Sequence, residues 1–236
     1  MIRTLITSTA LAATLCLPAF AQLQDNDPTL SLSESATVQM APDFATVSSG
    51  VVSRAETAQG AVRANAQAMS EVFDALRRAG VDSDDMQTAQ LSVSPVYADR
   101  RQPNQIERTI IGYEARNQVS AKVRDTDRVG QVIDAMVSAG ANNINGVTFG
   151  AEDTDEAMNE ARRAAIAELL AKAELFADAA GFELCGIRSM GESGMGRQPV
   201  YETRMMSMAD DMMATPVAAG TLTLTATVSA DFCINQ

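Results

Sequence analysis

The sequence predicts an α+β fold, in which antiparallel sheets pack against three main helices. Three times along the chain, a stretch with apolar residues at helical spacing ends at a glycine and is followed by a β-rich run: VFDALRRAGV, VIDAMVSAGA and ELFADAAGF. The glycines Gly80, Gly140 and Gly181 stand where a left-handed residue commonly ends a helix. Other runs alternate apolar and polar residues, which is the period of a strand with one solvated face.

The first two helices are expected over residues 55–79 and 127–139, because apolar residues recur there every three to four positions. Gly60 and Asn65 interrupt the first pattern, since both are weak helix formers. The expected apolar face of the first helix contains Val62, Met69, Val72, Phe73 and Leu76. That of the second contains Val129, Val132, Ile133 and Met136.

The third helix is expected over residues 154–180. Asp153 and Glu156 are placed like an acidic capping box at its start. Glu168 and Lys172 are four residues apart, so they predict a favourable ion pair along the helix. The expected apolar stripe consists of Met158, Ala161, Ala165, Leu169 and Phe176.

The strand signals have a period of two. TLTLTATVSADFCI, residues 221–234, is the clearest, with apolar residues at every even position. IIGYEARNQVSAKV repeats the alternation, and its inward residues should be Ile111, Tyr113, Ala115, Val119, Ala121 and Val123. LSLSESATVQM and FATVSSGVVS are separated by Ala41-Pro42-Asp43, which predicts a hairpin. Pro95 in LSVSPVY indicates an edge strand or a bulge.

Residues 1–21 have the pattern of a cleaved secretory signal peptide. Arg3 supplies a positive charge, the apolar stretch 5–17 is too short for a stable membrane helix, and Ala-Phe-Ala at 19–21 is a small-x-small cleavage site. A membrane anchor is the alternative, but Pro18 and the cleavage pattern favour removal. We therefore expect residues 22–236 to form one exported domain in the periplasm of a Gram-negative cell.

The composition disfavours several classes of function. The chain has 18 Lys and Arg against 30 Asp and Glu, a formal net charge of −12, so it repels nucleic acid and anionic lipid. It contains no histidine, which removes the usual catalytic base and the usual zinc ligand. We therefore predict a non-enzymatic protein with no cofactor, no nucleic-acid partner and no stable membrane insertion. No motif in the sequence indicates a small-molecule ligand.

Cys185 and Cys233 are the two cysteines that remain after the signal peptide. An even number of cysteines in an oxidising compartment is typical of a disulfide. Two separate buried thiols are the alternative, because a free cysteine packs like a small apolar residue. The sequence leaves both readings open.

Residues 191–220 form a predicted long loop, rich in Gly, Met and Pro and without a clear period. It contains RMMSMADDMM, whose methionines are Met205, Met206, Met208, Met212 and Met213. Thioethers suit Cu(I), and exposed methionine is oxidised reversibly, so a copper site and a redox buffer are two hypotheses. No His or Cys lies in the run, and methionine is common at adaptable contact surfaces. We favour a contact loop without a metal.

Acidic residues cluster at the expected helix starts: Asp125, Asp127, Asp153, Asp155, Glu156 and Glu160. Paired carboxylates carry glycoside hydrolysis, so a hydrolase is a further hypothesis. Capping explains these positions more simply, with Asp125 or Thr126 at the second helix. The run VDSDDMQT, with Asp82, Asp84 and Asp85, lacks the glycine and glutamate of a calcium loop and predicts a solvated turn. Arg100, Arg101 and Arg108 predict a basic hairpin tip.

Seven segments in a fixed order resemble the SIMPL-domain family: APDFATVSSGV, LRRAGV, T-x-x-L-x-V-x-P-x-Y at residues 88–97, IGYEARNQV, AGANNINGVTF, EARRAAIAELLAKAE and GTLTLTATV. The resemblance extends from about Ser31 to Phe232. Bacterial members include periplasmic immunogenic antigens and a protein linked to oxidative-stress defence, and some form ring-like oligomers. The resemblance implies an exported homo-oligomer for assembly or binding, with a role in envelope or oxidative stress. It supplies no catalytic residues to transfer.

Overall fold

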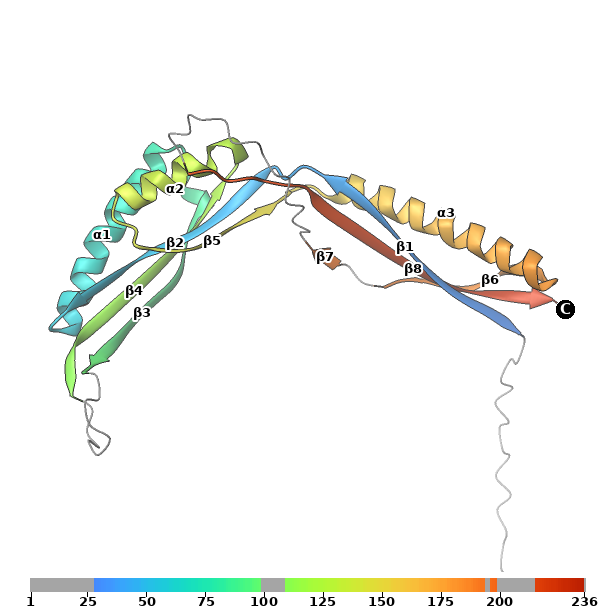
Figure 1. Cartoon of the computed structure of the whole chain (residues 1–236), viewed down its shortest axis with the longest axis horizontal. Coiled ribbons are helices and arrows are strands. Elements are labelled where there is room, and N and C mark those ends of the chain that lie inside the picture. Colours follow the sequence, from blue (N-terminus) through green and yellow to red (C-terminus); the bar gives the residue numbers. More distant parts are fainter. Residues whose placement is uncertain (1–27, 99–108, 194–195, 199–214, 236) are drawn as a thin grey trace, which may run out of the picture.

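The computed structural model describes residues 28–98, 109–193, 196–198 and 215–235, and these form two lobes. Each lobe is an antiparallel sheet covered by helices on one face, and the two lie end to end (Figure 1). The predicted α+β class is therefore confirmed.

The first lobe is continuous in sequence, and its strands lie in the order β3-β4-β2-β5. Its elements in chain order are β2 (Phe44–Ala55), α1 (Ala58–Arg78), β3 (Met86–Tyr97), β4 (Ile110–Val123), α2 (Val129–Ser138) and β5 (Asn143–Gly150). One 3-10 turn, Ser83–Asp85, precedes β3 and another, Thr126–Arg128, precedes α2. The β-α-β-β-α-β order with two central antiparallel strands is the ferredoxin-like, or split βαβ, arrangement.

Large aliphatic side chains fill the space between α1, α2 and this sheet. Among those with almost no exposed surface are Val47, Val72, Leu76, Val119, Val129, Val132 and Met136. Asn65 is also buried, and its Nδ2 donates to the carbonyl oxygens of Val51 (2.8 Å) and Ala115 (3.2 Å). This asparagine, which interrupts the apolar pattern, therefore ties α1 to the two central strands.

The second lobe is assembled from three separated parts of the chain. Its elements are β1 (Thr29–Met40), α3 (Asp155–Ala180), β6 (Glu183–Glu192), the short β7 (Gly196–Gln198) and β8 (Leu222–Asn235). The strand order is β1-β8-β6, and β7 also pairs with β8. The core under α3 is rich in alanine and consists of Ala36, Met158, Ala161, Ala165, Leu169, Ala173, Leu224, Ala226, Val228, Ala230 and Phe232.

The predicted hairpin between residues 30–40 and 44–53 is wrong. β1 pairs with β8, with Ala36 opposite Ala226, whereas β2 pairs with β4 and β5. The Pro-Asp signal does mark a change of direction, but residues 41–43 carry the chain from one sheet to the other. Turn chemistry is local, whereas the strand that pairs with β1 lies almost 200 residues later in the sequence.

Three residues expected on inward faces are exposed: Val62 by 40%, Ile111 by 62% and Phe176 by 44%. Ile111 lies beyond the end of β2, because Tyr113 pairs with Ala55, the last residue of that strand. On the two helices the buried stripes run through neighbouring positions instead. These positions are Ala61 and Asn65 on α1, and Ala173 and Ala177 on α3.

The helix-ending glycines and the edge position of Pro95 are confirmed. Gly80, Gly140 and Gly181 have φ values of 90°, 101° and 75°, the left-handed region that favours glycine. Pro95 lies in β3, an edge strand. The predicted loop 191–220 is shorter in its described parts: β6 continues to Glu192, β7 lies within it, and Val217 packs against the first-lobe core.

Candidate assembly surfaces

The hairpin of β3 and β4 extends beyond the start of α1, where no helix of the described chain lies over it (Figure 1). This part of the hairpin carries exposed apolar side chains. In the register, Leu91 lies opposite Asn117 and Val93 opposite Ala115, so both side chains lie on the helix-bearing face. We call the exposed apolar residues at this end of the hairpin, which include both of its faces, the hairpin surface; its members are Leu91, Val93, Tyr97, Ile110 and Ile111.

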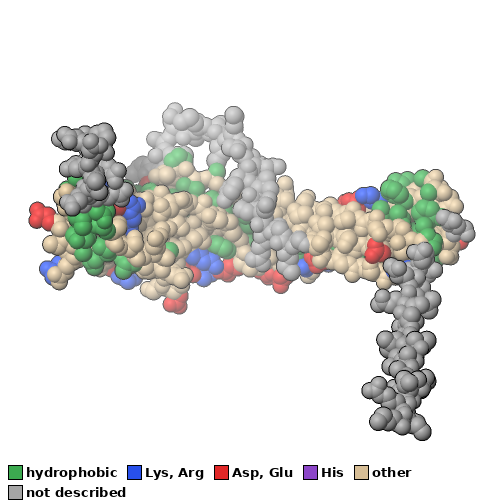
Figure 2. All heavy atoms as spheres, turned by 90° about the horizontal axis from the view of Figure 1, so that it is seen from below, with side chains coloured by type: hydrophobic (Ala, Val, Ile, Leu, Met, Phe, Trp, Pro, Cys, Tyr) green, Lys and Arg blue, Asp and Glu red, His purple; other side chains and the backbone are tan. Residues whose placement is uncertain are grey.

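A second apolar surface lies where α3 leaves β6 uncovered. Ile187 pairs with Phe232 and Met190 with Ala230, so their side chains lie on the face toward α3, yet they are 47% and 44% exposed. Leu170 lies on the same flank of α3, because it follows Arg162 by eight residues and Arg162 binds Glu192 at the end of β6. We call Leu170, Ile187 and Met190 the β6 surface. Figure 2 shows apolar side chains gathered near both ends of the molecule.

Near the junction of the lobes, ion pairs and hydrogen bonds join the segments through which the chain passes from one lobe to the other. Arg124 donates to both carboxylate oxygens of Asp85 (2.7 and 2.9 Å) and to Glu152 (2.8 Å). Lys122 binds the same oxygen of Glu152, and the backbone N–H of Glu152 donates to Asp43 (3.1 Å). Asp43 follows β1 and Glu152 follows β5, so this network joins two of the crossings.

These contacts keep the network in its charged form. The Arg124 guanidinium holds the pKa of Asp85 below its usual value, and Lys122 with Arg124 does the same for Glu152. A small cavity of about 110 Å³ lies beside Asp85, Lys122 and Arg124. Because its charges are already paired, the network acts as a fastening rather than as a site with a free base.

The third crossing is held by α2. Thr215 donates from its backbone N–H (3.0 Å) and from its hydroxyl (2.6 Å) to the carboxylate of Asp134. These hydrogen bonds lower the pKa of Asp134. Val217 and Ala219 then pack against the first-lobe core before the chain enters β8. The segment that follows the predicted methionine run is thus anchored to the first lobe.

The sheet faces turned away from the helices are polar in both lobes, but in different ways. In the first lobe, the buried carboxylate of Glu114 pairs with Arg54 (2.7 Å) and Arg116 (2.6 Å), which lower its pKa. In the second, Asp231 accepts hydrogen bonds from Ser189 (2.6 Å) and Ser31 (2.5 Å), and these lower its pKa. Neither carboxylate is left free for proton transfer.

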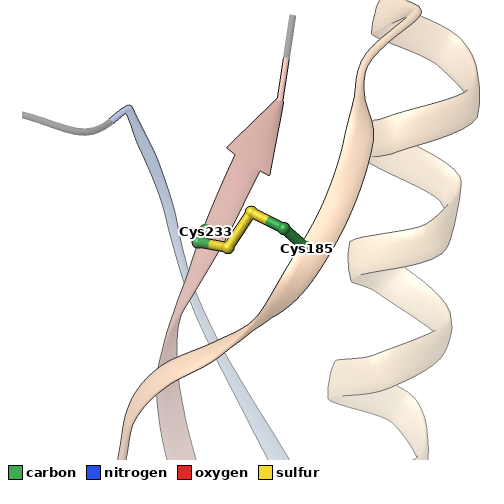
Figure 3. The surroundings of a disulfide bond; sticks show 2 residues. All are labelled: Cys185 and Cys233. Carbon is green, nitrogen blue, oxygen red and sulfur yellow. A yellow bond between two sulfur atoms is a disulfide. The ribbon is translucent and has the colours of Figure 1, made fainter.

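Cys185 and Cys233 lie on adjacent strands, β6 and β8, with Cα atoms 5.3 Å apart and their sulfur atoms joined (Figure 3). This Cα separation is within the range that a disulfide requires. The pair closes a span of 48 residues and fastens the edge strand β6 to the centre of its sheet.

The sequence of residues 30–232 matches the SIMPL family, described as "Protein of unknown function (DUF541)". The chain belongs to this family. It is 32% identical over 213 residues to the 26 kDa periplasmic immunogenic protein of Brucella melitensis, which covers 86% of this chain and 85% of that protein. It is also 29% identical over 191 residues to the uncharacterized protein YggE of Edwardsiella ictaluri, covering 81% and 79%, and 28% identical to YggE of Escherichia coli K12, covering 81% and 75%. The recognition of a SIMPL domain is therefore confirmed.

Several predicted positions of this SIMPL chain lie outside the described residues. They are the signal peptide, the arginines Arg100, Arg101 and Arg108, and the methionines Met205, Met206, Met208, Met212 and Met213. Copper binding by the methionine run therefore stays a hypothesis. Within residues 28–98, 109–193, 196–198 and 215–235, no cluster of three or more Cys, Asp or Glu could hold a metal ion. The same residues include no helix long and apolar enough to cross a membrane.

Two of the carboxylates of the hydrolase hypothesis accept hydrogen bonds from the local backbone. Asp125 accepts from the backbone N–H of Asp127 (3.1 Å) and Asp153 from that of Asp155 (3.0 Å). The details differ from the expected caps, because Thr154 occupies the N-cap of α3 and Asp153 precedes it. Lys172 binds Glu34 on β1 and not the predicted Glu168. For Lys172, a carboxylate on the neighbouring strand takes the place of the one on the same helix.

Three polar residues of the structure were missed or misread in the sequence. Asp85, expected in a solvated turn, is paired with Arg124, and the side chain is only 10% exposed. The sequence pattern marked Asn65 as an interruption of the first helix, and it gave no reason to single out Glu114; both residues are buried. For Asn65 the signal was present, since a polar residue at a core position of an amphipathic helix implies a buried hydrogen bond. For Asp85 and Glu114 the partners are distant in sequence and no local pattern indicates them.

Proposed function

We propose that this SIMPL protein is exported to the periplasm and acts there without catalysis, as an assembly of identical copies. The hairpin surface in the first lobe and the β6 surface in the second carry this proposal. They are two different apolar surfaces at separate places on an elongated molecule. Contact of one copy's hairpin surface with the next copy's β6 surface is head-to-tail, and such contacts close into rings when the rotation allows.

The compartment and the absence of catalysis have separate support. The signal-peptide pattern of residues 1–21 and the printed name of the Brucella relative support export to the periplasm. The absence of histidine and the use of Asp85, Glu114 and Glu152 in ion pairs support a role without proton transfer.

The test begins with the chain expressed with its own N-terminal segment and purified from the periplasm of a Gram-negative host. Its intact mass should correspond to cleavage after Ala21. Its native mass by light scattering should be several times that of one chain. A single-chain mass at all accessible concentrations would contradict the assembly.

Three variants then test the two surfaces. Ile111→Asp in the hairpin surface and Ile187→Asp in the β6 surface should each lower the native mass, since a buried unpaired carboxylate disfavours the contact. Val137→Asp is the matched control, because Val137 is 48% exposed but lies on α2, outside both surfaces. A mixture of Ile111→Asp and Ile187→Asp should form species that contain both variants, because each chain keeps the surface that the other has lost. If the contact joins identical surfaces, each variant pairs only with itself through its intact surface and no mixed species forms.

The proposed role in envelope or oxidative stress rests on the family resemblance. A strain lacking this protein should be more sensitive to hydrogen peroxide or to envelope-damaging agents. Complementation by Val137→Asp but not by Ile111→Asp would tie that role to assembly. Equal complementation by both variants would separate the stress role from assembly and redirect attention to the methionine run.

A further inference from the structure

Within the described residues, β1 differs from the other strands at sheet edges. The edge strand β3 contains Pro95 and two register shifts, β5 is bulged beside Gly146, and β6 has two register shifts. In contrast, β1 pairs with β8 through twelve consecutive residues, 29–40, without a shift. Its sequence, TLSLSESATVQM, has no proline, glycine, lysine or arginine.

Natural proteins protect sheet edges with bulges, proline, inward charges or short strands, because an open edge is a template for another strand. β1 carries one of these devices, the inward charge of Glu34 on the helix-bearing face, but that charge is bound to Lys172 on α3 of the same chain. In the described part of the chain, β1 hydrogen-bonds only to β8, so its other edge has no partner there. A twelve-residue regular edge is therefore open to strand addition.

We propose that β1 pairs with β1 of a second copy, antiparallel about Ser35, so that the second-lobe sheet continues from one chain to the next. This inference rests on the proposed self-assembly and names a contact of a different symmetry. The hairpin and β6 surfaces meet head to tail, whereas the β1 contact is the same on both chains. The head-to-tail contacts would build a ring, and the symmetric β1 contact would join two such rings.

The residue pattern of β1 fits this symmetric register. Centred on Ser35, the pairing places Leu32 opposite Val38 and Glu34 opposite Ala36 of the second copy. Leu30 then lies opposite Met40, so each apolar residue of the helix-bearing face meets another residue of that face. A centre at Glu34 places two like charges directly opposite each other, which is unfavourable. Any register centred on a residue keeps the faces matched, and the centres at Glu34 and Ser35 pair the longest stretches of β1, residues 29–39 and 30–40. Of these two, only Ser35 keeps the charges apart.

The position of α3 also fits. It packs on β1 and β8, whose axes are about 4.8 Å apart, so a β1–β1 contact places two α3 helices roughly 10 Å apart, a normal packing distance. The flank of α3 facing β1 contains Lys172, and the four-residue steps from it reach Ala164, Glu168 and Phe176. Phe176, 44% exposed in the single chain, lies on this flank.

Charges on that flank are complementary across the two-fold axis. Lys172 lies at the level of Glu34, and α3 runs antiparallel to β1 (Figure 1). One helical turn earlier, Glu168 lies near the level of Ala36, since a turn of helix and two strand residues both advance about 6 Å. Because Ala36 opposes Glu34 of the second copy, Glu168 of one chain lies beside Lys172 of the other.

Cysteine cross-linking tests both the contact and its register. Opposite residues in an antiparallel pair have Cα atoms about 4.5–5.5 Å apart, a distance that a disulfide spans. Ser35→Cys, in the full chain purified from the periplasm, should therefore give a covalent dimer on mild oxidation. Ser33→Cys alone should not, because its counterpart is Thr37, whereas the double variant Ser33→Cys/Thr37→Cys should. We expect at least tenfold more covalent dimer from the first and third variants than from the second.

The alternatives give different results. No covalent dimer from Ser35→Cys, in a sample whose native mass is oligomeric, overturns the β1 contact and leaves the proposed assembly standing. Cross-linking of Ser35→Cys to a different protein also overturns it, because the edge then receives another partner. A single-chain native mass removes the assembly itself. Ile111→Asp combined with Ser35→Cys should still cross-link, since the two contacts are separate.

A second variant measures the contact without a covalent bond. Ser35→Lys places two positive charges opposite each other and should raise the dissociation constant of the pair at least tenfold. Circular dichroism should stay unchanged, because the side chain of Ser35 is exposed in the single chain. An unchanged native mass for Ser35→Lys would contradict the proposal.

Discussion

The two lobes place a helix layer on an antiparallel sheet by different means. The first lobe is one continuous stretch, residues 44–150, whose core contains large aliphatic residues such as Leu76, Val72 and Met136. The second combines residues 29–40, 155–193, 196–198 and 222–235 around a core dominated by alanine. A continuous lobe can form through contacts between neighbours in sequence, whereas the second lobe needs both ends of the chain before its sheet is complete.

The alanines of the second lobe bring α3 close to its sheet but bury little apolar area per residue. The disulfide between β6 and β8, the pairing of β1 with β8 and the Lys172–Glu34 ion pair supply further links. We therefore expect that removing one of these links lowers the stability of the second lobe more than removing one polar link lowers that of the first lobe.

The largest expected effect comes from removing the disulfide. Replacing Cys185 and Cys233 by serine should cost about 4 kcal/mol, because the bond closes a span of 48 residues in the unfolded chain. Hydrogen exchange followed by mass spectrometry should show faster exchange in β6, β8 and α3, with little change in β2 to β5. Thiol titration of the unfolded, unreduced protein provides the control. Two free thiols there would show that the cysteines are not joined.

The next effect concerns the first-lobe core. Leu76 is fully buried between α1 and the sheet, so Leu76→Ala should lower the free energy of unfolding by about 3 kcal/mol, through lost burial and the cavity left behind. Urea unfolding measures the loss, and hydrogen exchange should assign it to the first lobe. Val137→Ala, on the exposed side of α2, is the control and should change stability by less than about 0.5 kcal/mol.

In the second-lobe core, a larger side chain rather than a smaller one should be destabilising. Ala165 has no exposed surface and lies where α3 meets the sheet, so Ala165→Leu should push the helix outward and cost about 2 kcal/mol. Ala171→Leu, an exposed position on the same helix, changes the same side chain without that contact. A stable Ala165→Leu variant would show that the layer under α3 is not closely packed.

The comparison also explains what the sequence could predict. In the first lobe, the helix ends, the edge strand and most core residues follow from local patterns, although Val62 and Ile111 were expected inward and are exposed. In the second lobe the alternation of residues 221–234 indicated a strand, but no pattern showed that it pairs with β1. The adjacent signal at Pro42-Asp43 suggested the wrong partner, β2.

The candidate surfaces were less predictable still. Ile111 and Phe176 have the residue type and spacing of core positions, and they are exposed only because neighbouring elements end or lie elsewhere. The methionine run is conspicuous in the sequence because its composition is unusual. The regular edge of β1 has no such local signal and is recognised only after its partner strand is known. Exposure of an apolar residue is a property of the whole fold, so a local period cannot report it.

The smallest expected effect compares the carboxylates on the two polar sheet faces. Arg54 and Arg116 lower the pKa of Glu114 in the folded state, so its ion pairs stabilise the protein above the ordinary carboxyl pKa of about 4.3. That stability is lost as the pH falls through the lowered pKa. Glu114→Gln should therefore be less stable than the parent at neutral pH, and the difference should shrink on acidification. Urea unfolding between neutral and acidic pH measures it.

Salt separates the two faces. Arg54 and Arg116 are largely exposed, so added sodium chloride should weaken their attraction to Glu114 and reduce the effect of Glu114→Gln. Asp231 is held by the neutral hydroxyls of Ser189 and Ser31, so the effect of Asp231→Asn should change little with salt. Equal salt dependence at both positions would mean that long-range charge, not these contacts, sets both pKa values. A difference would show that the lobes stabilise similar carboxylates, one through hydrogen bonds from charged arginines and the other through hydrogen bonds from neutral hydroxyls.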